Sequence, residues 1–369
     1  MDFVAENYCP PSNVADSFAS FRSSSIFPLS FYEERCVRCG NSMVKFGNRR
    51  NTTKEDVKKY SCPNCRVVRT PGFNRYAHLP VWVYDRVLFS MSKNYRNVDI
   101  LDEVKKKSRD LNLDVKISTP TIYNIVKKCS TLLNRFEPIA LQGLSTKHLD
   151  GTWCMDDRFH DLPFNQKLFS GGKLDKSKGH PHMHLTVVIH EETGYAFSGC
   201  VSKKRDRFVA MRALATAIGR AGVEPQILKI DMAKGLYSGA RAQLPSEKIS
   251  RVNKKENFSF NNAIERWFSD LGARFRKHEC RFKRPKTLEY GVNIYRYHRN
   301  FLRPYEKNQK TPAELLGIVL PHKTKDELSF IPLLNFADRL ISYVDSEVAR
   351  RGRMSSVNSQ RLLELIPSN

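Results

Sequence analysis

The chain has 369 residues, of which 40% are hydrophobic and 27% are charged, a balance typical of a folded protein with two or three domains. Lys and Arg number 62 against 38 Asp and Glu, so the formal net charge is +24. This excess favours a polyanionic partner, with nucleic acid ahead of a membrane surface. The sequence has no apolar run of about 18 residues, so we expect no transmembrane span and no membrane partner.

The first 30 residues are polar and rich in serine, and we interpret residues 1–30 as a flexible leader. They lack a basic region followed by an apolar core, so they do not resemble a signal peptide. The chain has nine cysteines, four of them in two CxxC pairs and the rest scattered, which favours a reducing compartment such as the cytoplasm.

Residues 31–76 carry the two CxxC pairs and predict a zinc ribbon. The ligands would be Cys36, Cys39, Cys62 and Cys65, with 22 residues between the pairs. Each CxxC turn can direct two thiolates at one ion, and four thiolates complete a tetrahedral structural Zn²⁺ site with no open catalytic position. Several basic residues surround the pairs, so the ribbon is also a candidate for DNA phosphate contact. The alternative is a purely structural ribbon or two unconnected thiol pairs.

Residues 77–140 predict a helical, helix-turn-helix-like DNA-binding segment. Helical spacing of apolar residues marks the stretches 79–89, 98–107 and 118–128, and Pro120 suits the first position of the third helix. The third stretch has polar and basic residues suited to a recognition helix in a major groove: Thr121, Tyr123, Asn124, Lys127 and Lys128. The alternative is an ordinary helical bundle with a solvated basic face.

Residues 145–318 predict an α/β catalytic core. Strand patterns cover 147–155, 182–190, 195–202 and 225–231; a helical pattern over 206–221 ends at Gly222, and another helix includes 261–268. The order strand, strand, strand, helix, strand, helix, helix is that of an RNase H-like fold, a mixed five-stranded sheet with flanking helices. In that fold the first and fourth strands lie side by side.

Three acidic residues fall on segments that this fold would bring together. Asp150 lies in the first predicted strand, Asp231 ends the fourth, and Glu265 lies on the later helix. Neighbouring strands are about 4.8 Å apart, so we expect Asp150 and Asp231 to reach the same ions. Clustered carboxylates repel one another unless cations bind, and carboxylate oxygens suit Mg²⁺ or Mn²⁺. We therefore predict that these three residues are catalytic and hold two Mg²⁺ or Mn²⁺ ions.

Other acidic residues compete for these roles. Asp156 and Asp157 compete with Asp150, which we prefer because the apolar pattern places it inside the strand and the other two after it. Three acids compete with Glu265, which alone follows the Asn-Asn-Ala-Ile segment: Glu256, Asp270 and Glu279. Asp231 and Glu265 also fit ordinary cap or surface positions.

Four segments carry a resemblance to a known family: HLDGTW, LKIDMAKGLY, NNAIERWFSDLGARFR and YRYHRNFLRPYEKNQKTPAELLGI. Together they resemble the DDE-type transposases of bacterial and archaeal insertion sequences, in particular the IS-six-like integrase-core group. The resemblance covers about residues 145–318 well and 36–140 more loosely. It implies an RNase H-like fold, an Asp-Asp-Glu triad at Asp150, Asp231 and Glu265, divalent metal, cleavage at element ends and strand transfer into a target.

One position departs from the family pattern. The family usually carries Lys or Arg seven residues after the glutamate, and this chain has Gly272 there. Three arginines are nearby and are the candidate DNA contacts of this helix: Arg266, Arg274 and Arg276. Arg276, eleven residues after Glu265, returns to the same helix face at about 100° per residue.

Residues 319–369 predict a helical C-terminal tail, with apolar residues at helical spacing over 331–348 followed by a basic stretch. We interpret this tail as a packing or dimerisation helix.

These features together predict a DNA transposase that binds double-stranded transposon ends and target DNA. Pairing two ends calls for a homodimer or a higher oligomer, and the family resemblance implies a prokaryotic, nucleoid-associated location in the cytoplasm. Two alternatives stay open: a catalytically retired, transposase-derived DNA-binding protein, and an RNase H-like nuclease.

Overall fold

The computed structural model describes residues 36, 38–39, 41–50, 56–69, 79–93, 95–142, 144, 148–161, 169–170, 173–174, 182–252, 262–275, 285–318, 320 and 329–364. The predicted leader, residues 1–30, lies outside these ranges. The chain divides into two compact units, residues 1–81 together with 331–369, and residues 82–330.

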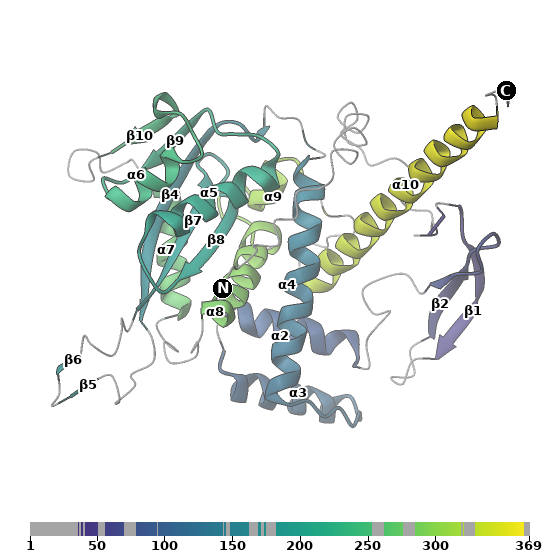
Figure 1. The fold of residues 1–369 in the computed structure, drawn as a ribbon. Coiled ribbons are helices and arrows are strands. Elements are labelled where there is room, and N and C mark those ends of the chain that lie inside the picture. Colours follow the sequence, from purple (N-terminus) through teal and green to yellow (C-terminus); the bar gives the residue numbers. More distant parts are fainter. Residues whose placement is uncertain are drawn as a thin grey trace. The chain divides into compact units, whose positions relative to one another are not determined.

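The first unit contains a small sheet and most of a long helix (Figure 1). The antiparallel strands, in spatial order, are β1 (Val44–Arg50), β2 (Asp56–Ser61) and β3 (Val68–Arg69). The helix is α10 (Phe330–Glu364), which confirms a helix over the predicted 331–348 and extends beyond it. The buried guanidinium of Arg69 lies 3.4 Å from the Asp338 carboxylate and also donates to the Ser342 hydroxyl, so β3 and α10 are joined by an ion pair.

The second unit is built on a mixed five-stranded sheet (Figure 1). Its strands, in spatial order, are β10 (Ile249–Arg251), β9 (Ile227–Ile230), β4 (Thr152–Asp161), β7 (His182–His190) and β8 (Ala196–Ser202). β4, β7 and β8 are antiparallel neighbours, whereas β9 runs parallel to β4 and β10 runs parallel to β9. The predicted adjacency of the first and fourth core strands is therefore confirmed as β4 beside β9. The arrangement is compatible with an RNase H-like core.

A separate two-stranded hairpin, β5 (Phe169–Ser170) with β6 (Lys173–Leu174), lies within the long connection between β4 and β7.

Two helices cover one face of the large sheet. α7 (Asn262–Phe275) and α8 (Pro285–Tyr297) share a core with the sheet that includes Cys154, Val187, Trp267 and Tyr295. Neighbouring residues of a strand point to opposite faces, so every second residue of β4 from Cys154 onward is directed toward α7. That alternation decides which side chains of β4 can meet those of α7.

The opposite face of the sheet carries α5 (Arg207–Ala221), where the Ser198 hydroxyl donates to the Ala213 carbonyl at 2.8 Å. The Asp206 carboxylate caps this helix by accepting from two backbone amides, and Gly222 ends it in the left-handed conformation with φ 70°. The helix predicted over 206–221 is thus confirmed, and its cap fixes the start of α5 beside the edge of the sheet.

The three helices predicted in residues 77–140 are present as α2 (Val81–Ser92), α3 (Asn97–Asp110) and α4 (Thr119–Gln142). α4 continues well past the predicted stretch and contacts α5 and α8. Near its C-terminal end, Glu137 is fully buried and accepts from Arg296 at 2.7 Å and from the Tyr195 hydroxyl at 2.7 Å.

Glu137 is a buried anion balanced by two cations. Arg296 and Arg220 contact it, the latter at 3.3 Å. Burial raises the pKa of Glu137, but the charges of the two guanidiniums lower it by more than burial raises it. The pKa of Glu137 is therefore below its usual value, and the group is ionised. Removing one partner of such a buried pair is strongly destabilising. The ion pair therefore fixes the second half of α4 to α5 and α8.

The remaining elements of the second unit are short: α6 (Lys234–Arg241), a 3₁₀ turn (Ser246–Lys248), a π-helical turn (His298–Leu302) and α9 (Pro312–Leu315). Thr311 and Glu314 form a capping box at the start of α9. None of the helices in the described ranges is long and apolar enough to cross a membrane.

Candidate metal centres and nucleic-acid interface

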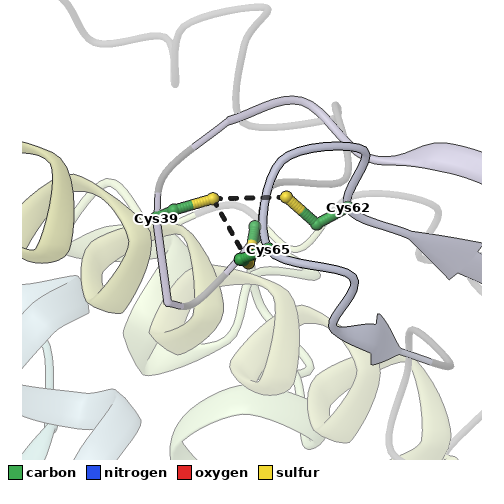
Figure 2. Close-up of side chains that lie close together, drawn as sticks. Cys39, Cys62 and Cys65 are labelled. Atoms are coloured by element: carbon green, nitrogen blue, oxygen red, sulfur yellow. Dashed lines mark hydrogen bonds between the residues drawn. The ribbon is translucent and has the colours of Figure 1, made fainter.

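The four predicted zinc ligands come together in the first unit. The separation between Sγ atoms is 3.3 Å for Cys36 and Cys65, 3.2 Å for Cys39 and Cys62, and 3.5 Å for Cys39 and Cys65. Figure 2 shows the side chains of Cys39, Cys62 and Cys65 directed at one another. All four sulfur atoms lie within 4.8 Å of one another, so the cluster can hold one metal ion, and four thiolates are the donor set that suits zinc.

Backbone turns at each CxxC pair place these thiols. The Cys39 amide donates to the Cys36 carbonyl at 3.3 Å, and the Arg66 amide donates to the Cys62 carbonyl at 2.9 Å. Burial raises the pKa of Cys62, but hydrogen bonds from the backbone at Cys65 and from neighbouring thiols lower it to about 6 overall. Burial raises the pKa values of Cys36 and Cys39, so a bound metal ion would be needed to hold all four thiols as thiolates, the form that binds metal.

A second group of metal-binding type lies where β4 meets β9. The parallel register pairs Met155 with Ile230, so the next residues, Asp156 and Asp231, follow side by side at the same level of the sheet. Carboxylate oxygens of Asp156, Asp157 and Asp231 all lie within 4.8 Å of one another. By the alternation of β4, Asp156 is directed toward the α7 face and Asp157 toward the α5 face.

Asp156 is 4% exposed, and one of its oxygens accepts from the Asp157 amide at 2.8 Å. Asp231 directly follows β9, and its Oδ1 accepts from the Ala233 amide at 2.8 Å. A nearly buried carboxylate with two more within reach is a strongly anionic site, and hard oxygen donors of this kind suit Mg²⁺ or Mn²⁺. The acidic group can therefore bind divalent metal.

Arg205 is the cation that faces this acidic group. Its Nε lies 2.6 Å from the Asp157 carboxylate, and its Nη2 lies 3.9 Å from that of Asp231. Burial lowers the pKa of Arg205, but the hydrogen bond that Arg205 donates to Asp157 and the charges of Asp157, Asp231 and Asp156 raise it above its ordinary value. The guanidinium thus offsets part of the negative charge where a metal ion would bind.

Asp150 lies elsewhere, contrary to the expectation that it meets Asp231. β4 begins at Thr152, so Asp150 precedes the strand, and its carboxylate accepts from Gln226 at 3.2 Å. Even Thr152, the first residue of β4, is four residues before Asp156, which is about 13 Å along an extended strand. Asp150 precedes Thr152 by two further residues. The sequence-based reason for preferring Asp150 is wrong on this point: Asp156 and Asp157 lie inside the strand, because antiparallel pairing with the long strand β7 extends β4 to Asp161.

Glu265 lies in the first turn of α7, is exposed, and is not among the acids within 4.8 Å of one another. On the helix it shares a stripe with Phe268 and Gly272, three and seven residues later. The Arg158 guanidinium contacts that stripe by donating to the Phe268 carbonyl at 2.5 Å. Because Arg158 and Asp156 are two residues apart on one face of β4, Glu265 is on the edge of α7 that adjoins the acidic group.

Gly272, where the family pattern has a basic residue, lies directly beneath Arg158. A Cβ added at Gly272 would come within 2.7 Å of the Arg158 guanidinium. The absent side chain thus makes room for a basic group from β4. Arg158 is a residue that sequence analysis missed, since nothing local in the chain links positions 158 and 272.

The predicted recognition residues of α4 differ in exposure. Tyr123, Asn124 and Lys127 are exposed, whereas Thr121 and Lys128 are partly buried. The Thr121 hydroxyl lies 3.0 Å from that of Ser118, and the Lys128 ammonium lies over the Tyr84 ring at 5.7 Å. Three of the five side chains are thus exposed to solvent on α4, and contact between these residues and DNA stays a prediction.

The predicted arginine contacts of α7 are described only in part. Arg266 is exposed. The side chain of Arg274, and Arg276 as a whole, lie outside the described residues.

Comparisons with known proteins add little. No family model matches the sequence, and no curated protein matches it. One similar solved structure is a cryo-EM structure of the simian T-cell lymphotropic virus intasome in complex with PP2A regulatory subunit B56 gamma, with 16% identity and a TM-score of 0.31. The match covers 48% of this chain and spans 56% of that chain. A likeness at this level does not establish a shared fold or function.

Proposed function

We propose that this protein is a metal-dependent DNA transposase, a polynucleotidyl transferase that cleaves DNA strands at element ends and joins them to target DNA. The observation that carries the proposal is the juxtaposition of Asp156, Asp157 and Asp231 at the junction of β4 and β9. The sequence resemblance to DDE-type transposases supports it independently, through motifs around Asp231 and Glu265.

In this proposal Asp156 and Asp231 are the two strand carboxylates that hold the ions, in place of the sequence-based pair of Asp150 and Asp231. Both lie on the sheet face that α7 covers. Two divalent ions, when bound, would activate the attacking oxygen and stabilise the leaving oxygen of an in-line phosphoryl transfer. Asp157 forms an ion pair with Arg205 on the other face of β4, so we assign to Asp157 the role of positioning Arg205.

Glu265 is the proposed third acid, and the direction of α7 supports it. Ala263 and Arg266 line a cavity with the turn that follows β7, at the level of Trp153 on β4. Phe268 contacts Arg158, five residues further along β4. α7 therefore advances along β4 in the same direction. Glu265 lies between Ala263 and Arg266 in the chain, near the level of Trp153 and about three residues before Asp156, and its exposed side chain is on the face of α7 that carries Phe268.

The surface next to the acidic group has the character of a nucleic-acid interface. Exposed basic residues lie before and at the start of α5, at the start of α6 and at the end of β10: Lys203, Lys204, Arg207, Lys234 and Arg251. Two large apolar side chains, Phe208 and Met232, are 58% and 52% exposed beside them. Basic groups that bind phosphates, interleaved with apolar groups that contact sugars or bases, suit a DNA strand.

We assign the cysteine cluster to one structural zinc ion and the ribbon, with α2–α4, to DNA binding. Four thiolate donors leave no open coordination position, so this cluster takes no part in the reaction chemistry. Double-stranded DNA is the proposed partner, and joining two ends calls for at least a dimer.

The direct test is a strand-transfer assay with purified protein, labelled duplexes bearing the flanking ends of the element, and Mg²⁺ or Mn²⁺. We expect nicks with 3′-hydroxyl ends, followed by joined products. Asp231→Asn and Glu265→Gln should each bind the duplex normally and lose both products, by about a thousandfold or more in rate.

The outcome also separates the competing functions. Products that are cut but never joined would favour an RNase H-like nuclease. Specific binding of the ends with no metal-dependent cleavage would favour a catalytically retired DNA-binding protein. If Glu265→Gln cleaves and joins as well as the wild type, the assignment of the third acid is wrong.

A further inference from the structure

A cavity of about 620 Å³ lies on the side of α7 opposite the acidic group, within the second unit. Its walls are α7, the turn between β7 and β8, and the segment that follows the π-helical turn. Its volume is that of a typical ligand site. The function proposed above gives it no role.

Two arginines converge on one carboxylate in this cavity, and a third arginine lines it. The Asp270 Oδ2 accepts from Arg299 at 2.6 Å and from Arg303 at 3.2 Å, while Arg266 is exposed and has no ion pair in the part of the chain that the structure describes. Arg299 is 7% exposed, and its Nε has no hydrogen-bond partner. The inner wall thus carries more positive charge than Asp270 neutralises, with a buried donor to spare.

The cavity is also rigidly built. The Tyr305 hydroxyl donates to the Thr193 carbonyl at 3.0 Å. Gly194 next to it has φ 65°, and a Cβ there would come within 2.0 Å of that hydroxyl, so only glycine allows this contact. The Arg299 guanidinium lies over the Tyr305 ring, 5.7 Å from its centroid, and burial raises the pKa of the phenol above its ordinary value.

Besides Asp270, three acidic residues line the cavity. Glu191 is paired with Lys229 at 2.8 Å, and Glu192 and Glu306 are exposed, with Lys307 next to Glu306 in the chain.

We propose that this arginine cavity binds a backbone phosphate of double-stranded DNA. Guanidinium groups with free N–H donors match phosphate oxygens in charge and geometry, and Arg266 and Arg303 lie at the accessible part of the wall. Arg266 directly follows Glu265 on α7, so DNA held here would be fixed to the helix that carries the proposed third acid. The inference rests on the proposed function and adds to it a phosphate site away from the ions.

The test measures the affinity of a short labelled duplex over a series of salt concentrations. Arg266→Gln, which breaks no ion pair, should weaken binding by about tenfold, and the slope of log K against log salt should fall by about 1. Arg303→Gln should do the same and Arg303→Lys should keep most of the affinity. Arg241→Gln is the matched control, an exposed helical arginine outside the cavity, and should leave the slope unchanged.

Three results would overturn the proposal. One is an unchanged slope for Arg266→Gln in a protein that folds and transfers strands normally, which would leave the proposed function intact. Another is an equal effect of Arg241→Gln, which would mean that any surface charge suffices. The third is calorimetric binding of inorganic phosphate that depends on Arg266 while DNA affinity does not, which would make this a site for free phosphate. A wild type that binds no DNA would overturn both this proposal and the proposed function.

Discussion

The two candidate metal centres were predicted from the same sequence by different kinds of information, and the structure brings all the predicted side chains together in only one of them. The four thiols are placed by two short turns, closed by hydrogen bonds between residues three and four apart in the chain, and all four predicted cysteines meet. The carboxylates come from separate elements, and their meeting depends on the register between β4 and β9. The sequence pattern placed Asp150 beside Asp231, whereas the structure places Asp156, six residues later, at that level of the sheet. Local spacing is therefore a safer guide to a ligand set than strand order.

The largest expected effect concerns the thiol centre. Removing its metal with a chelator, or substituting Cys62→Ser, should unfold the ribbon, because structural zinc contributes on the order of 10 kcal/mol to such small modules. Metal analysis should find about one zinc per wild-type chain and none in the variant. Cys129→Ala, at a buried cysteine outside the cluster, should retain the zinc. Wild-type protein without zinc would contradict the assignment.

The acidic centre is tested by exchanging the two candidate first acids. Asp156→Asn should lower the rate of strand cleavage by about a thousandfold, the loss typical of removing a group that stabilises the transition state. Asp150→Asn should change the rate by no more than about threefold, because Asp150 only accepts a hydrogen bond from Gln226. The reverse result would restore the sequence-based triad and refute the register argument.

Gly272→Ala tests how α7 is held over β4. Its Cβ would displace the Arg158 guanidinium, and a small misplacement of the helix that carries Glu265 should slow cleavage by about tenfold while DNA affinity stays the same. Gly219→Ala, on α5, meets nothing within 4 Å and is the matched control. We expect the control to keep full activity with slightly higher thermal stability, since alanine favours the helix. Equal cleavage rates for the two variants would show that the contact between Arg158 and Gly272 does not position α7 for cleavage.

The smallest effect is expected at Arg205. Arg205→Gln removes the cation that competes with metal for Asp157 and Asp231, so Mn²⁺ should bind about fivefold more tightly, equivalent to about 1 kcal/mol. Titration followed by calorimetry would measure this, with Arg207→Gln as the control on the neighbouring exposed arginine. Weaker Mn²⁺ binding in Arg205→Gln would mean that Arg205 orders the carboxylates and does not compete with the ion.

Much of the fold followed from the sequence for identifiable reasons. The helix over 206–221 has a capping aspartate at one end and a glycine at the other, and both signals are local. The apolar periodicity of α2, α3 and the start of α4 placed those helices, but not the length of α4. Glu137, in the second half of α4, is explained only by Arg296 and Arg220, which lie more than 80 residues away in the chain.

The sequence by itself determined the charge, the thiol cluster, the order of strands and helices, and the segments around Asp231 and Glu265. These depend on composition and on neighbours within a few residues, where the geometry of turns and helices is nearly fixed. Only the tertiary structure decided that Asp156 lies opposite Asp231, that Arg205 faces the acids, that Arg158 occupies the space above Gly272, and that two arginines contact Asp270. Each of these pairs is brought together by strand register or by packing of helices on the sheet. Register shifts one residue at a time, and alternation then exchanges one face of a strand for the other, so apolar patterning alone cannot specify which acids meet.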